Sequence, residues 1–476
     1  MNQAMSTLHL HRRAIYTVLS SLIVLLFIVL FIQNESIKSR TSIRNELSYS
    51  NDKKYVLDKE HKIGEKQSNN YEIYSLKKEW FLDNCLSNFD KNNLKFEEIE
   101  DYVQKFQESD KENCRFIYKI FNSMFELDIS YGEIRIDDKF LDKVKVWLNN
   151  NPDYISQAYK QKIIKIYNKY YNDEMIYNPL RGKRPQSKQT VSEKNYSLDI
   201  LRESKNGCDF CQESYKINTA NEIFDRLETS LSYSAANTFK YDKWHSLIVS
   251  RNHDTLFLNE EEIIDLYSLS LKWFEKVNSI DSKAVYPELI WDAMPKSGAS
   301  QIHTHLQVSM DEKSYYGVMR RWLKASTQYF NENKRDFLDD FILIHKALGL
   351  VYEVNNCFVI FTLIPLKDNE VMIIGNDDPE SYLTISKLTH RVIRIFVDKI
   401  EQYSFSTGMY FPIFGEKKTS YDPSKLEKIY SKILFRSPVA NLRSDFNGLD
   451  LFTSSVIGVD RYILANRVFT ELEKYQ

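Results

Sequence analysis

The stretch Ser297-Gly-Ala-Ser-Gln-Ile-His-Thr-His-Leu-Gln307 decides how the rest of the sequence is interpreted. Successive side chains of a strand point to opposite faces, so a strand through its second half would present His303, His305 and Gln307 on one face. Two imidazoles and a carboxamide on one face could attack and hold a phosphate group, although a lone His-x-His pair also arises by chance or as a metal pair. The small residues before it let the backbone approach an anion closely. The stretch therefore predicts a phosphate-handling active site.

The segments on either side predict an α+β fold with an internal duplication. Strands are expected at residues 244–249, 288–292, 303–308, 358–364 and 370–374. Asn259 followed by Glu262 has the spacing of a capping box and predicts a helix between the first two strands, and a second helix is expected over 379–403. Because the order of strands and helix repeats, we expect two halves, residues 176–345 with the site and residues 346–476 without a second His-x-His.

The N-terminal part is expected to be organised differently. Residues 14–32 contain no charge and are long enough to span a bilayer as a transmembrane helix, and the bulky residues at their end favour a signal anchor. The tail, residues 1–13, would most simply stay cytosolic, which gives a type II single-pass membrane protein with its body in the lumen of the ER or Golgi. Basic residues on both sides leave the orientation open. Residues 33–70 are interpreted as a polar stem. Apolar spacing of three and four, as at 163–171, predicts a small helical domain or extension over 71–175.

The cysteines allow more than one interpretation. Cys85 and Cys114 both lie in the predicted helical region, where a disulfide would fit a lumenal domain and two buried thiols would fit equally well. Cys208-Asp-Phe-Cys211 could be half of a zinc site, a redox pair or neither. One pair supplies only two of the four ligands of a zinc ion, so a zinc site needs histidine partners downstream. Those candidates are His245, His253, His303 and His305.

These residues resemble the histidine-triad superfamily, in particular its galactose-1-phosphate uridylyltransferase and diadenosine-tetraphosphate phosphorylase branch. The resemblance covers about residues 176–476 and follows the order of the family's motifs. Besides the His-x-His-x-Gln motif and the cysteine pair, the similar segments are Tyr177-Asn-Pro-Leu-Arg-Gly-Lys-Arg-Pro185, Ser234-Ala-Ala-Asn-Thr-Phe239 and Leu247-Ile-Val-Ser-Arg-Asn-His253. Thr304 between the histidines, Leu306 before the glutamine and the fused first segment depart from the uridylyltransferases, and they leave the sugar and the acceptor undefined.

The resemblance implies two HIT-like half-repeats, each an antiparallel sheet with helices, and a bound Zn²⁺ ion. By position, the zinc ligands would be Cys208, Cys211, His253 and His303. His305 would be the nucleophile that forms a covalent nucleotidyl-histidine, and Gln307 would donate to a phosphoryl oxygen. Further substrate contacts would come from Arg181, Arg184, Asn237, Ser297, Gly298 and Ser300.

The expected activity is nucleotidyl transfer from a nucleotide sugar or dinucleotide to a sugar 1-phosphate or orthophosphate. The net charge of −2 argues against nucleic acid as a partner. Two alternatives stay open: a hydrolase of the same fold, and an inactive zinc-stabilised module that binds a nucleotide or sugar. In an oxidising lumen, a Cys208–Cys211 disulfide could replace the zinc half-site. The membrane would be contacted through residues 14–32, and a homodimer is an open possibility. We interpret His245, His345 and His390 as structural.

Overall fold

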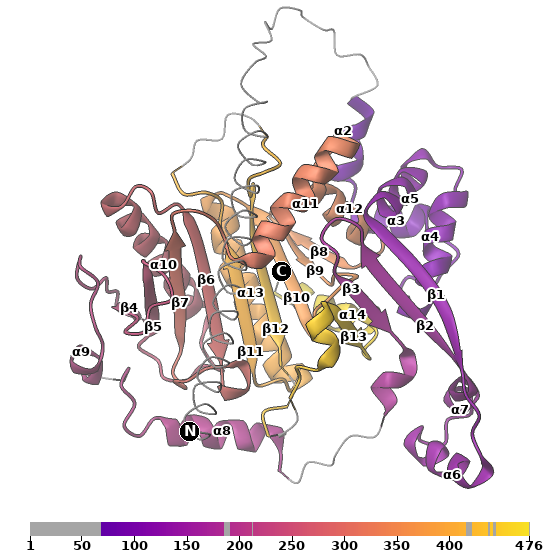
Figure 1. Ribbon diagram of the computed structural model, residues 1–476, viewed down its shortest axis with the longest axis horizontal. Helices are drawn as coiled ribbons and strands as arrows, with labels where there is room; N and C mark the ends of the chain where they lie inside the picture. The colour runs from indigo at the N-terminus through magenta and orange to yellow at the C-terminus, as the bar shows by residue number, and fades with distance from the viewer. Residues whose placement is uncertain are drawn as a thin grey trace, which may run out of the picture. The chain divides into compact units, whose positions relative to one another are not determined.

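An antiparallel sheet of nine strands lies at the centre of the described part of the chain. The computed structural model describes residues 68–184, 191–211, 213–415, 421–436, 438–440 and 444–475. The strands are ordered β4-β5-β7-β6-β11-β12-β10-β9-β8 across the sheet (Figure 1). Their bounds are β4 Ser232–Ala236, β5 His245–Ser250, β6 Tyr286–Ala293, β7 His305–Asp311, β8 Val351–Val354, β9 Cys357–Ile360, β10 Glu370–Asn376, β11 Phe405–Tyr410 and β12 Lys428–Phe435.

Two helices pack on one face of this sheet. Helix α10, Glu260–Ile280, contacts β4, β5 and β7, whereas α13, Pro379–Ile395, contacts β9 and β10. The predicted start of α10 is confirmed, because the side chain of Asn259 accepts the backbone N–H of Glu262 while the Glu262 carboxylate accepts that of Asn259. The apolar stripes of both helices bury the inward side chains of the sheet, among them Leu306 and Val308 of β7.

The strand order repeats as the duplication predicts. In the first half β4-β5-β7-β6 lie side by side with α10 between β5 and β6 in sequence, and in the second half β9-β10-β12-β11 do so with α13 between β10 and β11. The halves join where β6 pairs antiparallel with β11. The expected strands over 358–364 and 370–374 correspond to the shorter β9 and to β10. Strand β8 adds an edge to the second half.

A second sheet of four strands, in the order β1-β2-β3-β13, is formed within the described residues on the right-hand side of Figure 1. Its strands are β1 Phe125–Glu133, β2 Lys160–Asn168, β3 Glu174–Tyr177 and β13 Ser454–Ile457. The helical domain or extension predicted over 71–175 is therefore not purely helical, because β1, β2 and the start of β3 lie within it. Residues 163–171 fit a helical spacing, but Ile164, Ile166 and Asn168 are buried at every second position and form a strand. Antiparallel pairing with β1 stabilises this segment as a strand and not as a helix.

The helices of the N-terminal region pack beside this second sheet. They are α2 Ser68–Ser75, α3 Lys78–Asn84, η1 Phe96–Glu98, α4 Ile99–Glu108, α5 Glu112–Met124, α6 Asp138–Trp147 and α7 Pro152–Tyr159. The remaining helical elements connect the strands or close the chain. They are η2 Pro179–Lys183, α8 Glu193–Ser204, α9 Ser214–Asn218, η3 Pro295–Ser297, α11 Gly317–Asn333, α12 Phe337–Ala347, η4 Phe396–Ile400, η5 Gly448–Phe452 and α14 Arg461–Glu473.

The membrane prediction needs a correction. None of the helices in the described ranges is both long and apolar enough to cross a bilayer. Helix α10 has 21 residues, but its first turn holds three glutamates and its buried residues follow one stripe, so it is a surface helix of the sheet. The predicted span at 14–32, the tail at 1–13 and nearly all of the stem lie outside the described residues. The fold is α+β, and we retain neither the single-pass membrane topology nor the lumenal location.

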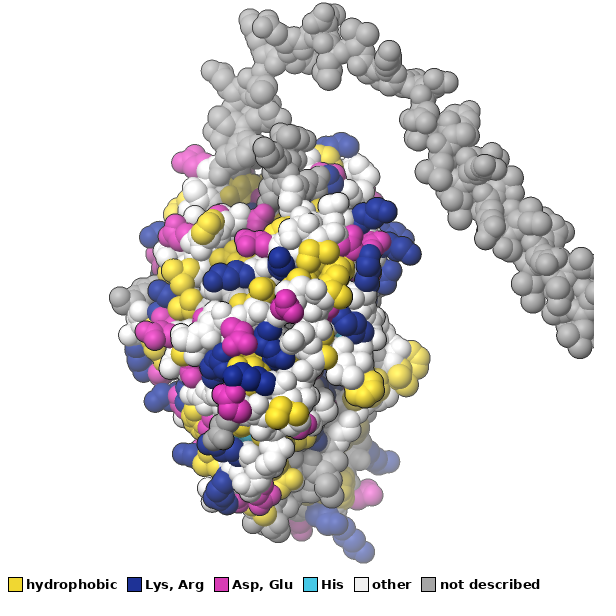
Figure 2. Space-filling view, turned by 90° about the vertical axis from the view of Figure 1, so that its left-hand side faces the viewer, with side chains coloured by type: hydrophobic (Ala, Val, Ile, Leu, Met, Phe, Trp, Pro, Cys, Tyr) yellow, Lys and Arg dark blue, Asp and Glu magenta, His cyan; other side chains and the backbone are white. Residues whose placement is uncertain are grey.

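Figure 2 shows the side of the molecule that lies to the left in Figure 1. Acidic and basic side chains are interspersed over this face with apolar ones. This mixture agrees with a chain of 64 basic and 66 acidic residues.

Cys85 and Cys114 form a disulfide. Cys85 caps the C-terminus of α3, Cys114 lies in α5, and their Cα atoms are 5.6 Å apart. Both side chains are buried in the main core. The sequence allowed either a disulfide or two buried thiols, and the structure contains the disulfide. It closes a loop over a sequence separation of 29 residues.

Replacing Cys85 and Cys114 together by serine should lower the free energy of unfolding by about 3 kcal/mol, because the unfolded chain regains the entropy of the opened loop. Denaturant unfolding of the full chain measures this. Reductant should shift the wild type by a similar amount and leave the double variant unchanged. If the double variant unfolds at the same denaturant concentration as the oxidised wild type, the loop constraint is absent.

Candidate functional site

Two thiols and two imidazoles meet beside the end of β5 and the start of β7 in the nine-stranded sheet. The ligand atoms of Cys208, Cys211, His253 and His303 all lie within 4.8 Å of one another. Three of the four residues are buried and Cys211 is half-buried. The two cysteines are free thiols, so the alternative of a Cys208–Cys211 disulfide does not describe this structure. Such a group could hold a metal ion.

The four residues come from three separate segments. The cysteines lie between α8 and α9, His253 follows β5, and His303 lies two residues before the start of β7. Strands β5 and β7 are neighbours, with Val249 paired to His305, so the chain segments after one strand and before the other lie together. Tyr233 of β4 donates its hydroxyl to the carbonyl of Phe210 at 2.9 Å and so holds the cysteine segment beside these strands.

Each histidine presents Nδ1 to the cluster because an oxygen holds its other nitrogen. His303 Nε2 lies 2.7 Å from the carbonyl oxygen of Ser250 and must donate to it. His253 Nε2 lies 3.0 Å from the hydroxyl of Ser204. The two Nδ1 atoms are then 3.1 Å apart, and both point at the thiols. Burial lowers the pKa of His303 to about 4 and also lowers that of His253, so both rings are in the neutral form that binds metals.

His305 opens β7 and is oriented by the residue two positions before it. Its Nδ1 lies 2.8 Å from the backbone carbonyl oxygen of His303. A carbonyl can only accept, so Nδ1 carries the proton and the lone pair of the neutral ring is on Nε2. Phe210, between the two cysteines, packs edge-on against His305 at 5.5 Å and against His303 at 5.7 Å. Burial lowers the pKa of His305, and the nearby Asp292 opposes that change.

Gln307 lies on the same face of β7 as His305, as the alternation of the strand predicts. Its Oε1 atom is 3.2 Å from Nε2 of His245 and 3.4 Å from the hydroxyl of Tyr241. Asn237, which follows β4, places its Nδ2 atom 3.3 Å from the same His245 nitrogen. The structure therefore brings Asn237 to Gln307 through a histidine that the sequence analysis had treated as structural.

Two carboxyl groups were missed by the sequence analysis. Glu288 and Asp292 alternate with Ile290 along β6, and Ile290 is paired with Gln307, so all three share the face of the predicted nucleophile. Burial raises the pKa of Glu288 to about 8. Burial also raises the pKa of Asp292, while the hydroxyl of Ser406 and the charges of His305 and Arg436 lower it. The alternation within the strand expected at 288–292 was the available signal.

The small residues before the motif have different positions. Ser297 is buried, and its hydroxyl bonds to that of Ser404, so this hydroxyl links η3 to the start of β11. Gly298 has φ of 103°, a conformation that favours glycine. Gly298 and Ser300 are exposed. The roles of all three as substrate contacts stay predictions.

The structure does not bring Arg181 and Arg184 to the cluster. Both are exposed on or beside η2, and a Cβ on Gly182 between them would overlap the carbonyl oxygen of Gly458, which follows β13. The N–H of Gly458 donates to Asp368, just before β10. Strand β10 is four positions from β7 in the sheet, which is roughly 19 Å at the usual strand spacing. Their phosphate contacts stay a prediction for which this arrangement gives no support.

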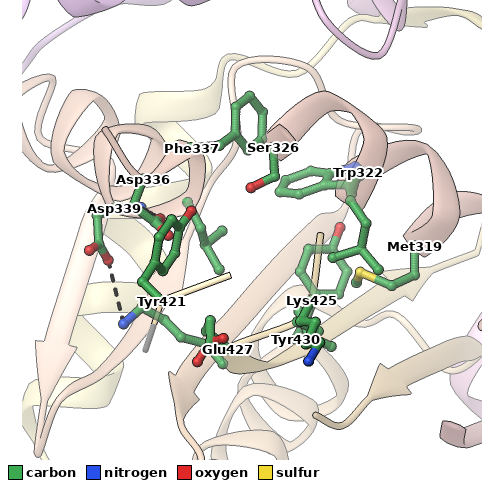
Figure 3. Close-up of a pocket in the computed structure, with 14 residues that line it drawn as sticks. Met319, Trp322, Ser326, Asp336, Phe337, Asp339, Tyr421, Lys425, Glu427 and Tyr430 are labelled. Carbon is green, nitrogen blue, oxygen red and sulfur yellow. Dashed lines mark hydrogen bonds and ion pairs between the residues drawn. The ribbon is translucent and has the colours of Figure 1, made fainter. Parts of the chain in front are cut away.

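A cavity of about 470 Å³ lies on the sheet face that also carries His305 and Gln307, but over β12 in the second half. Helices α11 and α12 and the segment before β12 enclose it, and the rings of Trp322, Tyr421 and Tyr430 line it together with Asp336 and Asp339 (Figure 3). Among the described residues that line it, none was predicted as a site residue. The candidate site is therefore defined by side-chain chemistry at β7 and not by this cavity.

Comparison with known proteins gives similar solved structures only. No protein-family model and no curated protein matches the chain. An ADP-glucose phosphorylase from Arabidopsis thaliana with bound ADP-glucose is 13% identical, with 63% of this chain and 95% of that chain covered and a TM-score of 0.48. A GALT-like protein from Arabidopsis thaliana is 15% identical, with 55% and 90% covered and a TM-score of 0.43. A yeast Ap4A phosphorylase is 10% identical, with 65% and 88% covered and a TM-score of 0.30.

The names of these three proteins fall in the branch that the sequence motifs resemble. Their identities of 10–15% and TM-scores below 0.5 carry no argument about substrate or mechanism. Such arguments rest on the residues of this chain.

Replacing Glu288 by glutamine should change how stability depends on pH. The pKa of Glu288 is about 8 when folded and 4.5 in the reference state, so the folded protein holds this proton longer. The stability that the protonated Glu288 contributes to the folded state is fully present below pH 4.5. It is lost as the pH rises towards 8, which lowers the free energy of unfolding by up to about 4 kcal/mol. The free energy of unfolding of Glu288→Gln should therefore fall less between pH 5 and pH 8 than that of the wild type.

Denaturant unfolding at several pH values measures this dependence. Glu126→Gln, at an exposed position of β1, is the matched control and should follow the wild type. Parallel curves for Glu288→Gln and the wild type would mean that Glu288 ionises normally.

Proposed function

We propose that this protein is a nucleotidyltransferase that acts through a covalent nucleotidyl-histidine on His305. The observation that carries the proposal is the 2.8 Å contact between Nδ1 of His305 and the carbonyl of His303. It places the lone pair of a neutral imidazole on Nε2, and the nucleophile needs no separate base to remove a proton. Gln307 on the same strand face supports a site for a phosphoryl group, because its amide can donate to a non-bridging oxygen.

The proposed reaction has two displacements at one phosphorus atom. Nε2 of His305 attacks the α-phosphorus of the nucleotide, an Nε2–P bond forms, and the bond to the bridging oxygen breaks with its electron pair leaving on the departing phosphate group. A phosphate oxygen of the acceptor then attacks the same phosphorus, and the electron pair of the broken P–N bond returns to Nε2. The ring is cationic in between, since Nδ1 keeps its proton, and the carbonyl dipole of His303 stabilises that charge.

We propose Zn²⁺ as the metal of the thiol–imidazole group. Tetrahedral zinc with ordinary bond lengths of about 2.3 Å to sulfur and about 2.0 Å to nitrogen places sulfur and nitrogen ligands about 3.5 Å apart and two nitrogens about 3.3 Å apart. The corresponding sulfur–nitrogen distances are 3.4, 3.4 and 3.5 Å, and the two Nδ1 atoms are 3.1 Å apart. All four ligand positions are protein groups, so a bound zinc ion would be structural and would fix the segment that carries His305.

The proposed donor is a nucleotide sugar or a dinucleotide, and the proposed acceptor is orthophosphate or a sugar 1-phosphate. Arg181 and Arg184, Ser297, Gly298 and Ser300 remain proposed contacts, and a homodimer remains a prediction.

Zinc binding is tested by metal analysis of the full chain. The wild type should contain about one zinc ion per chain, and Cys211→Ser should lose most of it because one of four ligands is missing. Cys357→Ser is the control, since Cys357 is also a free thiol but lies on β9. Less than one zinc per wild-type chain, or full retention in Cys211→Ser, would remove the four-ligand site.

The covalent intermediate is tested by incubating the full chain with α-labelled UDP-glucose, GDP-glucose, ADP-glucose or Ap4A and quenching in acid or in base. A phosphorus–nitrogen bond to histidine is labile in acid and stable in base, so we expect a base-stable label on the wild type. His305→Ala should lose the label completely. His390→Ala should keep it, because His390 lies on α13 and contacts the carbonyl of Leu258 at 3.1 Å, outside the cluster.

The same experiment separates the competing functions. Label that passes to orthophosphate or to a sugar 1-phosphate supports transfer, and label that passes only to water indicates a hydrolase. An unlabelled wild type with no product from any donor and acceptor would refute the transferase and favour a binding module.

A further inference from the structure

The carboxamide of Gln307 is in contact with two side chains from the start of β5 and from the turn before it. His245 begins β5 and is fully buried, and Tyr241 lies in the turn between β4 and β5. The two rings are packed together with centroids 3.7 Å apart. Nε2 of His245 and the hydroxyl of Tyr241 both approach Oε1 of Gln307, at 3.2 and 3.4 Å.

The backbone decides which nitrogen of His245 carries the proton. The backbone N–H of Tyr241 donates to Nδ1 of His245 at 3.4 Å, so Nδ1 is the acceptor and Nε2 is protonated in the neutral ring. Burial lowers the pKa of His245 to about 4, which keeps the ring neutral at physiological pH. Nε2 of His245 is therefore a donor. Nδ2 of Asn237 lies 3.3 Å from Nε2 of His245 and is a donor as well, since Oδ1 of Asn237 accepts the N–H of Phe239 at 2.8 Å, so this contact is not a hydrogen bond in that tautomer.

The N–H on Nε2 of His245 determines the orientation of the Gln307 amide, because it can only donate, whereas the hydroxyl of Tyr241 can donate or accept. With Oε1 towards His245 and Tyr241, both donors are satisfied. With the amide turned over, its NH₂ group would face the N–H of a fully buried imidazole and leave that donor unpaired, which is unfavourable. The NH₂ group of Gln307 is thereby directed away from β5, where a phosphoryl oxygen can accept from it.

We infer that His245 and Tyr241 are positioning residues that hold the Gln307 carboxamide with its amino group towards the phosphoryl group transferred by His305. This inference rests on the proposed function for its catalytic consequence, but the orientation itself does not. Neither residue touches the reacting atoms, and their effect passes through Gln307. A donor that is already oriented costs no reorganisation in the transition state, which is the source of its catalytic effect.

Single-turnover labelling of the full chain tests the catalytic consequence. His245→Phe removes the donor and should slow formation of the nucleotidyl-enzyme by roughly 10-fold or more at saturating nucleotide, with a much smaller change in the concentration that half-saturates the rate. His245→Gln can place an amide N–H near the position of Nε2 and should recover most of the rate. His390→Phe is the control for loss of a histidine elsewhere.

Repeating the His245→Phe change in a Gln307→Met protein distinguishes a positioning effect on Gln307 from a general loss of structure. If His245 acts only through Gln307, His245→Phe should cause no further loss in a Gln307→Met protein, although each change alone is harmful. Wild-type labelling rates in His245→Phe overturn the inference, as does an equal loss in the two backgrounds. Tyr241→Phe should show a weaker form of the same pattern, because one donor remains.

A measurement without substrate tests the orientation even if the proposed function fails. In protein with ¹⁵N-labelled histidine, the signal missing from His245→Phe belongs to His245, and its nitrogen shifts report the tautomer. A proton on Nε2 supports the inference and a proton on Nδ1 overturns it. A wild type that no nucleotide labels would refute the transferase proposal, and the tautomer would still decide whether His245 orients Gln307.

Discussion

The site depends on His303 making three contacts at once. Its Nε2 donates to the carbonyl of Ser250, its Nδ1 faces the two thiols, and its own carbonyl accepts the proton on Nδ1 of His305. The ring of His303 therefore cannot turn without disturbing the cluster, and its backbone cannot move without releasing His305. In the function that we propose, His303 would hold the metal through its ring and fix the tautomer of the nucleophile through its carbonyl, two residues apart in the chain.

The duplicated sheet explains where such a site can form. Both halves place a strand in the position of β7, but in the second half that strand is β12, and α11 and α12 cover its outer face, with Trp322 packed on Tyr430 at 5.0 Å. In the first half the same face is covered by the short cysteine segment and Tyr241 instead. In the second half this face is therefore covered by packed helices. In the first half it is left open enough for the three segments with the cysteines, His253 and His303 to meet at β7.

Local signals predicted most of the elements, and long-range pairing accounts for what was missed. The capping box of Asn259 and the strands around Ile290 and His305 are encoded in a few neighbouring residues. The four metal-ligand candidates came from a resemblance to known motifs, since no spacing in the sequence states that the segment after β5 meets the cysteines. Strand β2 was read as helix because both periods fit it. His245 was set aside because only the pairing of β5 with β7 reveals Gln307 beside it.

The acidic side chains near the proposed nucleophile would repel a phosphate, and burial in the fold reduces this repulsion. A phosphate anion at His305 and Gln307 would be repelled by ionised carboxylates at Glu288 and Asp292, which share that face. Burial raises the pKa of both groups, and at Glu288 the value of about 8 leaves the carboxyl mostly protonated at neutral pH. A protonated carboxyl can donate a hydrogen bond to a ligand oxygen, so the same low dielectric that keeps His305 neutral turns a repulsive neighbour into a polar but uncharged one.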